Sequence, residues 1–400
     1  MPATQARVVV VGAGLGGLRA AERLRALGHT GPLAVIGAEG REPYTRPPLS
    51  KAALTGDHPD ADLEDLVRLR RRPSVGDADW LLGDAAVALD PAAREIELAS
   101  GRVVAYDGLV LATGLTPARL PLPGAEYARH VLRTVDDALA LRPRLTPGTA
   151  VVVVGAGFVG CEVAASAVAR GCRVTVVDPL PEPMAAGLGT GLGGWLRALH
   201  ERHGVDWRLG HGVAGFSGAA ASASVLLDDG EALEAEVVVE AVGSRPSVGW
   251  LGGAGLDLTD GVQCDEALRV VGLAGAVAVG DIARWPNPRY GLGPRRVEHW
   301  ALAVESARAA AATLWADLSG QAGAPAFDPV PSFWSDQYDV TAQAFGMPSA
   351  GDSEQLLEGA LDDPAGAVVG YLRAGAPIGV ASVGLPVSRA VHWRDTWLSA

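Results

Sequence analysis

Two segments of the chain carry glycines at the spacing Gly-x-Gly-x-x-Gly, which suits them to bind the pyrophosphate of a dinucleotide. Glycines let the backbone approach the phosphates closely, and the amides and dipole at a helix N-terminus attract their negative charge. A single copy of this fingerprint is weakly specific, but two copies, each between a strand and a helix, predict two dinucleotide sites. The residues concerned are Gly12, Gly14, Gly16 and Gly17 in the first copy, and Gly155, Gly157, Phe158, Val159 and Gly160 in the second.

Each fingerprint lies within a predicted β–α–β unit, so a later part of the chain repeats an earlier one. A run of four valines precedes each copy, at 8–11 and 151–154. Such continuous apolar runs are typical of strands that are buried on both faces of a parallel sheet. Helical patterns follow over 18–27 and 161–170, and each leads to a second strand. The sequence therefore predicts an α/β protein with two Rossmann-like dinucleotide-binding domains.

Asp178 indicates which nicotinamide cofactor the second site takes. It closes the strand that follows the second fingerprint, where a carboxylate can accept hydrogen bonds from the ribose hydroxyls. A carboxylate there repels a 2′-phosphate, and no arginine follows before Arg197. NADH is therefore favoured over NADPH, and the alternative is that Asp178 is only a surface turn residue.

The composition narrows the classes of partner and chemistry. The 400 residues suffice for two to three domains, and the apolar content of 48% with 20% charged residues is typical of a globular chain. A net charge of −13 argues against nucleic acid as the main partner. Three cysteines without C-x-x-C spacing exclude a disulfide framework, a dithiol relay and the commonest zinc sites.

Metal binding and membrane insertion are not predicted either. His200, His203 and His211 lie close in sequence, but no carboxylate or cysteine completes a ligand set. Residues 1–7 are short and polar rather than a signal peptide, and the longest apolar runs are far shorter than the ~20 residues of a membrane span. We therefore expect no metal, no membrane span and a cytoplasmic location.

The stretch Pro43–Lys51 indicates that the first site binds a flavin. It resembles the R-P-P-L-S-K segment of the FAD-dependent ferredoxin reductases that serve bacterial cytochromes P450 and Rieske-type oxygenases. Further motifs of that family, between about residue 7 and at least residue 360, match at 112–114, 132–137, 280–283, 297–300 and 333–338. The resemblance implies a glutathione-reductase-like fold with an added small C-terminal α+β interface domain.

The resemblance also implies how the chain divides into domains. An FAD-binding domain is expected over 1–114 and 243–326, and an NADH-binding domain over 115–242. The interface domain is expected over 327–400. This last segment is too small to be a catalytic domain alone. The resemblance implies that it packs over the flavin through Trp334.

The FAD contacts follow from the resemblance residue by residue. Asp281 should accept from the ribityl chain, and Trp300 should begin a helix whose N-terminus faces the flavin pyrimidine. The family usually has an acid directly after the glycine that ends the second strand; here Ala38 follows Gly37, and we assign the ribose contact to Glu39. The predicted FAD set is Gly12, Gly14, Gly16, Gly17, Ala38, Glu39, Arg46, Lys51, Val87, Ala112, Thr113, Gly114, Arg133, Asp281 and Trp300. The predicted NADH set is Gly155, Gly157, Phe158, Val159, Gly160, Glu162, Asp178 and Gly243.

Lys51 is the only lysine of the chain, and the other 32 of its 33 basic residues are arginines. A lysine supplies a compact point charge where the planar fork of arginine does not fit, although a single lysine can also persist on a surface by chance. In the resembled family this lysine lies beside flavin N5 and is paired with the glutamate after the second fingerprint. Lys51 and Glu162 are therefore the predicted catalytic residues. Phe158 matches the aromatic residue that covers the flavin, and the alternative is a packing role.

The predicted function is electron transfer from NADH through FAD to a 2Fe–2S or 3Fe–4S ferredoxin that serves an oxygenase. An acidic ferredoxin needs a local basic patch on so acidic a chain, and we expect it at residues 68–72 and Arg308. The oligomeric state is left open between monomer and homodimer. One alternative is an oxidase or reductase with another acceptor, but its redox cysteine is missing between Gly37 and Lys51. Another is a signalling flavoprotein that resembles apoptosis-inducing factor, which the acidic composition disfavours.

Overall fold

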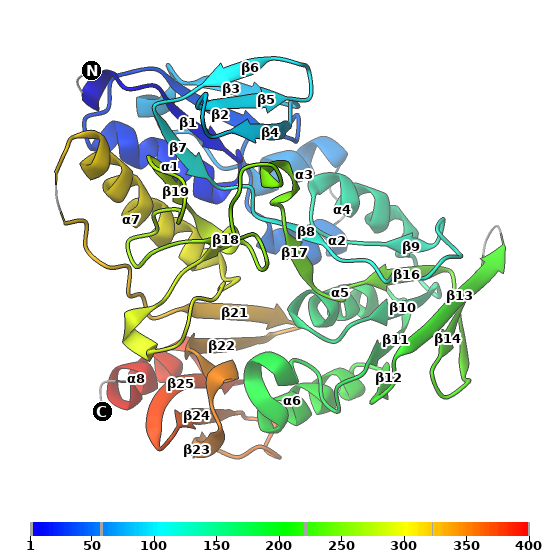
Figure 1. Ribbon diagram of the computed structural model, residues 1–400. Helices are drawn as coiled ribbons and strands as arrows, with labels where there is room; N and C mark the ends of the chain where they lie inside the picture. The colour runs from blue at the N-terminus through cyan, green and yellow to red at the C-terminus, as the bar shows by residue number, and fades with distance from the viewer. Residues whose placement is uncertain (1–2, 57–58, 220–221, 322, 399–400) are drawn as a thin grey trace. The chain divides into compact units, whose positions relative to one another are not determined.

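The computed structural model describes residues 3–56, 59–219, 222–321 and 323–398 of the chain, and Figure 1 labels its elements. Contacts between residues divide the chain into two compact units, each assembled from separated segments. Unit 1 comprises Met1–Thr45, Arg68–Thr116 and Arg245–Pro331, and unit 2 comprises Arg46–Val67, Pro117–Ser244 and Ser332–Ala400. Each unit contains one glycine fingerprint on a parallel sheet of its own.

The first fingerprint follows the central strand of the parallel sheet in unit 1. The strand order is β19-β7-β1-β2-β3, and all neighbours are parallel. The bounds are β1 Val8–Val11, β2 Leu33–Gly37, β3 Asp79–Leu82, β7 Gly108–Leu111 and β19 Ala276–Ala278. Helices α1 (Leu15–Ala26) and α7 (Trp300–Leu318) pack against each other and against β7. All four valines of β1 are buried, as the apolar run predicts.

Two smaller sheets complete unit 1. The first is antiparallel and consists of β4 (Ala86–Asp90), β5 (Glu95–Leu98) and β6 (Val103–Ala105). The second pairs β18 (Val262–Gln263) with β20 (Ala283–Arg284) in parallel. Because β20 directly follows the short 3₁₀ helix Gly280–Ile282, this pairing fixes the segment that contains Asp281.

The second fingerprint follows the central strand of a similar sheet in unit 2. Here the order is β12-β11-β10-β16-β9, again parallel throughout. The bounds are β9 Arg129–His130, β10 Ala150–Val154, β11 Arg173–Asp178, β12 Val205–Leu209 and β16 Val237–Glu240. Helix α5 (Phe158–Ala169) begins inside the fingerprint and packs on β10 and β11. An antiparallel sheet of β13 (Val213–Ala219), β14 (Ser222–Leu227) and β15 (Ala232–Ala235) adds a further apolar cluster.

The C-terminal part of unit 2 is a five-stranded antiparallel sheet in the order β21-β22-β25-β24-β23. Its strands are β21 Ser332–Gln337, β22 Val340–Gly346, β23 Ser353–Gly359, β24 Ala367–Arg373 and β25 Ala376–Val383. Helix α8 (Val387–Trp397) packs on it, as does α6 (Ala185–Arg202). Strand β21 also contacts α5, which brings this sheet to the second fingerprint. Unit 2 further contains α2 (Ala52–Thr55), α3 (Asp60–Val67) and α4 (Val135–Leu141).

The predicted fold class is confirmed: two Rossmann-like parallel sheets are accompanied by a C-terminal α+β element. The helices after the fingerprints begin at residues 15 and 158, three residues earlier than their sequence patterns predict at both sites. The three-domain division stays a prediction, and the contact-based units assign residues 46–67 to unit 2. Among the described residues, no helix has the length and apolarity that crossing a bilayer requires.

Candidate functional site

The first fingerprint forms a tight turn that only glycine can make. Gly12 has φ +117°, and a Cβ on it would lie 2.1 Å from the carbonyl oxygen of Ala112 at the end of β7. A Cβ on Gly17 would lie 1.8 Å from the carbonyl oxygen of Gly12. Both contacts are with backbone that cannot move aside, so these glycines let β1 and α1 approach closely.

Gly14 has a different environment from its neighbours. It is the N-cap residue of α1, and because it has no side chain the first turn of the helix has no side-chain cap. No atom of another segment lies within 4 Å of its Cβ position. The first amides of a helix need acceptors, and here they border open space beside a glycine. The negative charge of a pyrophosphate suits amides in this position. By contrast, a Cβ on Gly16 would lie 2.9 Å from the Val279 side chain, so Gly16 allows packing between α1 and the segment before Asp281.

Glu39 lies just beyond β2, where a ribose-binding acid is expected. Its carboxylate accepts a hydrogen bond from the Tyr44 hydroxyl at 2.5 Å, and the Tyr44 ring is buried. Ala38 is exposed and offers no polar side chain. Tyr44 therefore orients the carboxylate to which the ribose contact is assigned, a role that sequence reasoning missed although Tyr44 lies inside the Pro43–Lys51 motif.

The remaining predicted FAD residues of unit 1 lie on four further segments. Thr113 follows β7 and donates its hydroxyl to the carbonyl oxygen of Ser247 at 2.7 Å, and Gly114 has φ +64°. The carbonyl oxygen of Asp281 accepts a hydrogen bond from Arg296 at 3.1 Å. Trp300 begins α7. Val87 lies in β4, where the register with β5 shifts, and is 47% exposed.

Trp300 is tied to the motif that first suggested a flavin. Its indole Nε1 donates to the Thr45 hydroxyl at 3.0 Å, so the start of α7 is held against Thr45 within unit 1. The Trp300 side chain nevertheless remains 40% exposed, which is unusual for so large an apolar group. The first residue of α7 is thus held by a hydrogen bond while much of its side chain remains exposed.

The second fingerprint repeats the geometry of the first within unit 2. Gly155 has φ +105°, and a Cβ on it would lie 2.4 Å from the Ala241 carbonyl oxygen. A Cβ on Gly160 would lie 1.9 Å from the Gly155 carbonyl oxygen. Gly157 caps α5 without a side-chain bond, and no other atom lies within 4 Å of its Cβ position. The same open cradle therefore occurs at the start of α5.

Asp178 ends β11 and is held beside this cradle. Its carboxylate accepts hydrogen bonds from the backbone amides of Ala156 at 2.6 Å and Leu180 at 2.8 Å. Because Ala156 is inside the fingerprint, the carboxylate is fixed where a ribose next to the pyrophosphate would lie. Val159 is exposed on the first turn of α5, and Gly243 has φ +96° with open space around its Cβ position.

Lys51 and Glu162 form an ion pair, with 2.7 Å between Nζ and Oε1. Glu162 projects from the second turn of α5 and is 6% exposed. Its other oxygen accepts a hydrogen bond from the Ser50 hydroxyl, and Oε1 also accepts one from the Ser335 hydroxyl at 2.9 Å. Three donors therefore offset the loss of water around this carboxylate. The structure brings the two predicted catalytic residues together, and sequence reasoning missed both serines.

The segment that carries Lys51 is attached to α5 and α4. The hydroxyl of Ser166 on α5 donates to the Ser50 carbonyl oxygen at 2.6 Å. Arg46 donates from Nη1 to the Arg133 carbonyl oxygen at 2.5 Å, just before the capping box of Thr134 that begins α4. Arg46, Lys51 and Arg133, three predicted FAD residues, are thus held on one continuous framework in unit 2.

Phe158 packs inside unit 2 in the present arrangement. Its ring meets that of Phe333 edge to face, with 4.7 Å between the centroids. The Cβ position of Gly187 on α6 lies 3.3 Å from the same ring, so a larger residue at 187 would push it away. Phe158 remains partly exposed, and a covering role at the flavin stays a prediction.

The basic residues expected to bind a ferredoxin are partly engaged by acids of unit 1. Arg71 pairs with Glu42 at 2.6 Å and lies over the Trp80 ring, and Arg72 lies 3.5 Å from Glu22. Residues 70–72 and Arg308 are all exposed. The run therefore carries less net positive charge at the surface than its sequence indicates.

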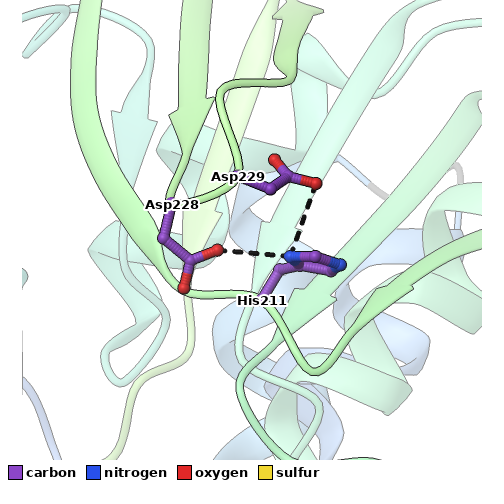
Figure 2. Close-up of side chains that lie close together, drawn as sticks. All are labelled: His211, Asp228 and Asp229. Atoms are coloured by element: carbon purple, nitrogen blue, oxygen red, sulfur yellow. Dashed lines mark hydrogen bonds and ion pairs between the residues drawn. The ribbon is translucent and has the colours of Figure 1, made fainter.

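The three histidines considered as metal ligands do not converge. His200 is buried against Gln337, whereas His211 lies on the surface beside Asp228 and Asp229 (Figure 2). The distances from His211 Nδ1 are 3.2 Å to Asp228 Oδ1 and 3.5 Å to Asp229 Oδ2. The prediction that no carboxylate completes a ligand set is thus wrong for His211, because the hairpin between β14 and β15 brings both aspartates to it. These groups bond to one another and to the Gly212 amide, and we assign no ion to them.

The comparisons with known proteins agree with this geometry. Residues 6–307 match the family model described as pyridine nucleotide-disulphide oxidoreductase, and residues 332–393 match the model described as reductase C-terminal. Rhodocoxin reductase of Rhodococcus erythropolis is 36% identical over 359 residues, covering 89% of this chain and 81% of that protein. The anthranilate 1,2-dioxygenase system ferredoxin–NAD(+) reductase component of Burkholderia cepacia is 36% identical over 355 residues, covering 86% and 83%. The solved covalent putidaredoxin reductase–putidaredoxin complex matches with a TM-score of 0.87 and 30% identity, over 98% of this chain and 92% of that one.

Proposed function

Since the chain belongs to the pyridine nucleotide-disulphide oxidoreductase family, we propose that it is an FAD-dependent NADH:ferredoxin reductase of an oxygenase system. The observation that carries the proposal is the pair of open glycine cradles at Gly14 and Gly157. Each cradle has a carboxylate held near the end of the next strand, from Glu39 and Asp178 respectively. Two dinucleotides of different kinds therefore have matching sites in one chain.

The first cradle fits FAD. The amides that begin α1 would bind its pyrophosphate, Glu39 would bind the adenosine ribose, and Asp281 would accept from the ribityl chain. When bound, FAD supplies the conversion of a two-electron hydride donor into single-electron steps. The FAD-binding segments proposed are 1–114 and 243–326, with 115–242 binding NADH and 327–400 forming the interface domain.

Lys51 is proposed to stabilise negative charge that develops at the flavin. Its ammonium is fixed by Glu162, and the carboxylate is itself fixed by hydroxyls, so neither group has to reorganise during the reaction. Arg46 and Arg133 belong to the same framework and are proposed to bind FAD. These roles follow the resemblance to the ferredoxin reductases and agree with the contacts made within unit 2.

NADH is the proposed electron donor because Asp178 presents a carboxylate to the ribose. Two backbone amides already bind that carboxylate, so it cannot turn away from an incoming 2′-phosphate without losing both hydrogen bonds. The Asp178 carboxylate therefore repels the 2′-phosphate of NADPH, which NADH lacks. The curated relative from Burkholderia cepacia is likewise named for NAD(+).

A ferredoxin is the proposed acceptor rather than a disulfide or a peroxide. All three cysteines, Cys161, Cys172 and Cys264, are buried. Burial raises the pKa of the Cys264 thiol to about 12 and the pKa of the Cys161 thiol still further, so neither is ionised near neutrality. The solved relative in complex with putidaredoxin supports a protein acceptor of this kind. Residues 68–72 with Arg308 are the proposed docking patch. A cytoplasmic location is proposed because that compartment supplies NADH and keeps thiols reduced.

The proposal is tested by a sequence of three measurements on the purified protein. Flavin absorbance and titration with FAD establish whether the cofactor binds, and stopped-flow mixing compares reduction by NADH and NADPH. Reduction of cytochrome c through added ferredoxins then measures turnover. A colourless protein that takes up no FAD, or fast NADH oxidation that no ferredoxin accelerates, would refute it. Slow reduction without ferredoxin turnover would favour the signalling alternative.

A further inference from the structure

A continuous run of side-chain hydrogen bonds connects Glu162 with the interior of the C-terminal sheet. The Ser335 hydroxyl contacts Glu162 Oε1 at 2.9 Å, and Gln337 Nε2 contacts the Ser335 hydroxyl at 3.0 Å. Gln337 Oε1 lies 2.8 Å from His200 Nε2, and His200 Nδ1 lies 3.1 Å from the Tyr338 hydroxyl. The run therefore passes from α5 across β21 to α6 and returns to the end of β21.

Every proton in this run has only one consistent position. The Gln337 amide donates to Ser335 and also contacts the Met184 sulfur at 3.2 Å, so its oxygen must accept from His200. Burial lowers the pKa of His200 to about 4, and the neutral ring therefore carries its proton on Nε2 and accepts on Nδ1. It follows that Tyr338 donates to His200, and that Ser335 donates to the carboxylate. All donors point toward Glu162.

The three inward-facing residues of β21 each contact a different side chain of α5 or α6. Phe333, Ser335 and Gln337 alternate with half-buried neighbours, so they share one face of the strand. Phe333 contacts Phe158, Ser335 contacts Glu162, and Gln337 contacts His200. This face of the strand thus contacts α5 through Phe333 and Ser335, and α6 through Gln337.

The run is buried enough for its orientation to be fixed. Gln337 is 1% exposed, and Ser335 and His200 are fully buried. Aromatic rings confine its far end, since His203 stacks on Tyr338 with 3.7 Å between centroids and Trp207 meets His200 edge to face at 5.5 Å. Water cannot replace a lost donor at such a site, so each member depends on the next.

We propose that Ser335, Gln337 and His200 are positioning residues that hold Glu162, and through it the Lys51 ammonium, in the orientation needed for reduction of the flavin by NADH. This inference rests on the proposed function, and it gives the C-terminal sheet a role in the hydride step in addition to any contact with a ferredoxin. None of the three need touch FAD or NADH for this purpose. They act by fixing which oxygen of Glu162 faces Lys51.

The first test measures flavin reduction in the FAD-loaded protein by stopped flow. Ser335→Ala removes the donor to Glu162 and should lower the limiting rate of reduction about tenfold, the effect of losing one hydrogen bond to a charged group, without changing the NADH dissociation constant. Gln337→Met, which has a similar volume, should lower the rate severalfold although it does not contact Glu162. Ser335→Thr retains a hydroxyl and should restore most of the rate.

The control and the background variant separate positioning from mere packing. Ser382→Ala removes another buried hydroxyl of the C-terminal sheet, one whose oxygen makes no hydrogen bond among the described residues, and should leave the rate unchanged. In a Glu162→Gln background the effect of Ser335→Ala should shrink to less than twofold, because the group it positions is already altered. The proposal would be overturned if Ser335→Ala lowered the rate by the same factor in the Glu162→Gln background as in the unsubstituted protein. An unchanged rate for Ser335→Ala alone would also overturn it.

A second readout does not depend on activity. Nitrogen-15 NMR of histidine side chains in the purified protein should show His200 neutral from pH 5 to 8, with the proton on Nε2. Gln337→Met should remove that tautomer preference, whereas Ser382→Ala should preserve it. A proton on Nδ1 in the unsubstituted protein would overturn the proposal even if NADH reduces the flavin. Failure of NADH to reduce a protein with the expected tautomer would instead count against the proposed function.

Discussion

Replacement of either partner in the Lys51–Glu162 pair should destabilise the protein unequally, because the two side chains are buried to different depths. The side chain of Glu162 is 7% exposed and that of Lys51 is 23% exposed. In Lys51→Met the carboxylate keeps only the hydroxyls of Ser50 and Ser335 as donors. Removal of one partner from a buried pair costs about 3–5 kcal/mol, and the partial access of Lys51 to water favours a loss of about 3 kcal/mol.

Glu162→Gln should cost less. The amide oxygen can still accept from a serine hydroxyl, and the flexible Lys51 stem lets its ammonium turn toward water. The expected loss is about 1–2 kcal/mol, comparable to one hydrogen bond to a charged group. Lys51→Met combined with Glu162→Gln removes both charges of this pair. Its loss should therefore fall well below the sum of the two single losses.

Thermal unfolding, followed by circular dichroism on the protein as purified, measures these differences. For a cooperative unit of 150–250 residues, 1 kcal/mol corresponds to about 2–4 °C in Tm, so Lys51→Met should lower Tm by about 6–12 °C. Ser382→Ala serves as the control for a buried substitution in the same unit. The reasoning is refuted if Glu162→Gln lowers Tm more than Lys51→Met does, or if the double variant loses the full sum.

Three further outcomes are expected. Gly14→Ala should fold, since its Cβ meets no atom within 4 Å, but should weaken FAD binding in an absorbance titration; Gly17→Ala should give little folded protein because its Cβ would lie 1.8 Å from a backbone oxygen. Asp178→Asn should raise the KM for NADH about tenfold and reduce the preference for NADH over NADPH, because one charged acceptor is lost. Steady-state kinetics measures both effects, and an unchanged preference would show that Asp178 does not bind the ribose. Charge reversal of the arginines at 70–72 should raise the ferredoxin KM and flatten its dependence on salt, and an unaltered KM would remove this patch from consideration.

The two dinucleotide folds could be predicted because their determinants are local. A valine run, a glycine turn and a helical pattern follow one another within about thirty residues, and each specifies the next by short-range sterics and burial. The helix starts were predicted three residues late, because glycines in their first turns have poor helix propensity in isolation. These are Gly16 and Gly17 in α1 and Gly160 in α5. Close packing of Gly17 on the Gly12 carbonyl compensates for this weakness, and that contact is visible only in three dimensions.

The network around Glu162 could not be predicted, because it depends on pairings between segments more than a hundred residues apart. Ser50, Glu162 and Ser335 come from three segments of unit 2. No spacing rule relates a histidine at 200 to a glutamine at 337, and neither residue type indicates a partner by itself. His211 shows the same limit, since the aspartates beside it come from a hairpin turn that its own sequence neighbourhood does not contain.

The alternating pattern of β21 sets a boundary for exchanging C-terminal modules between reductases. A graft of the C-terminal sheet from another reductase would most simply be joined before Ser332, where unit 2 resumes. That junction would also import foreign residues at Phe333, Ser335 and Gln337, which face the host's own helices. A junction placed after Tyr338, with only Trp334 and Asp336 varied upstream, keeps every hydrogen bond of the run that ends at Glu162 while the rest of the C-terminal sheet is exchanged.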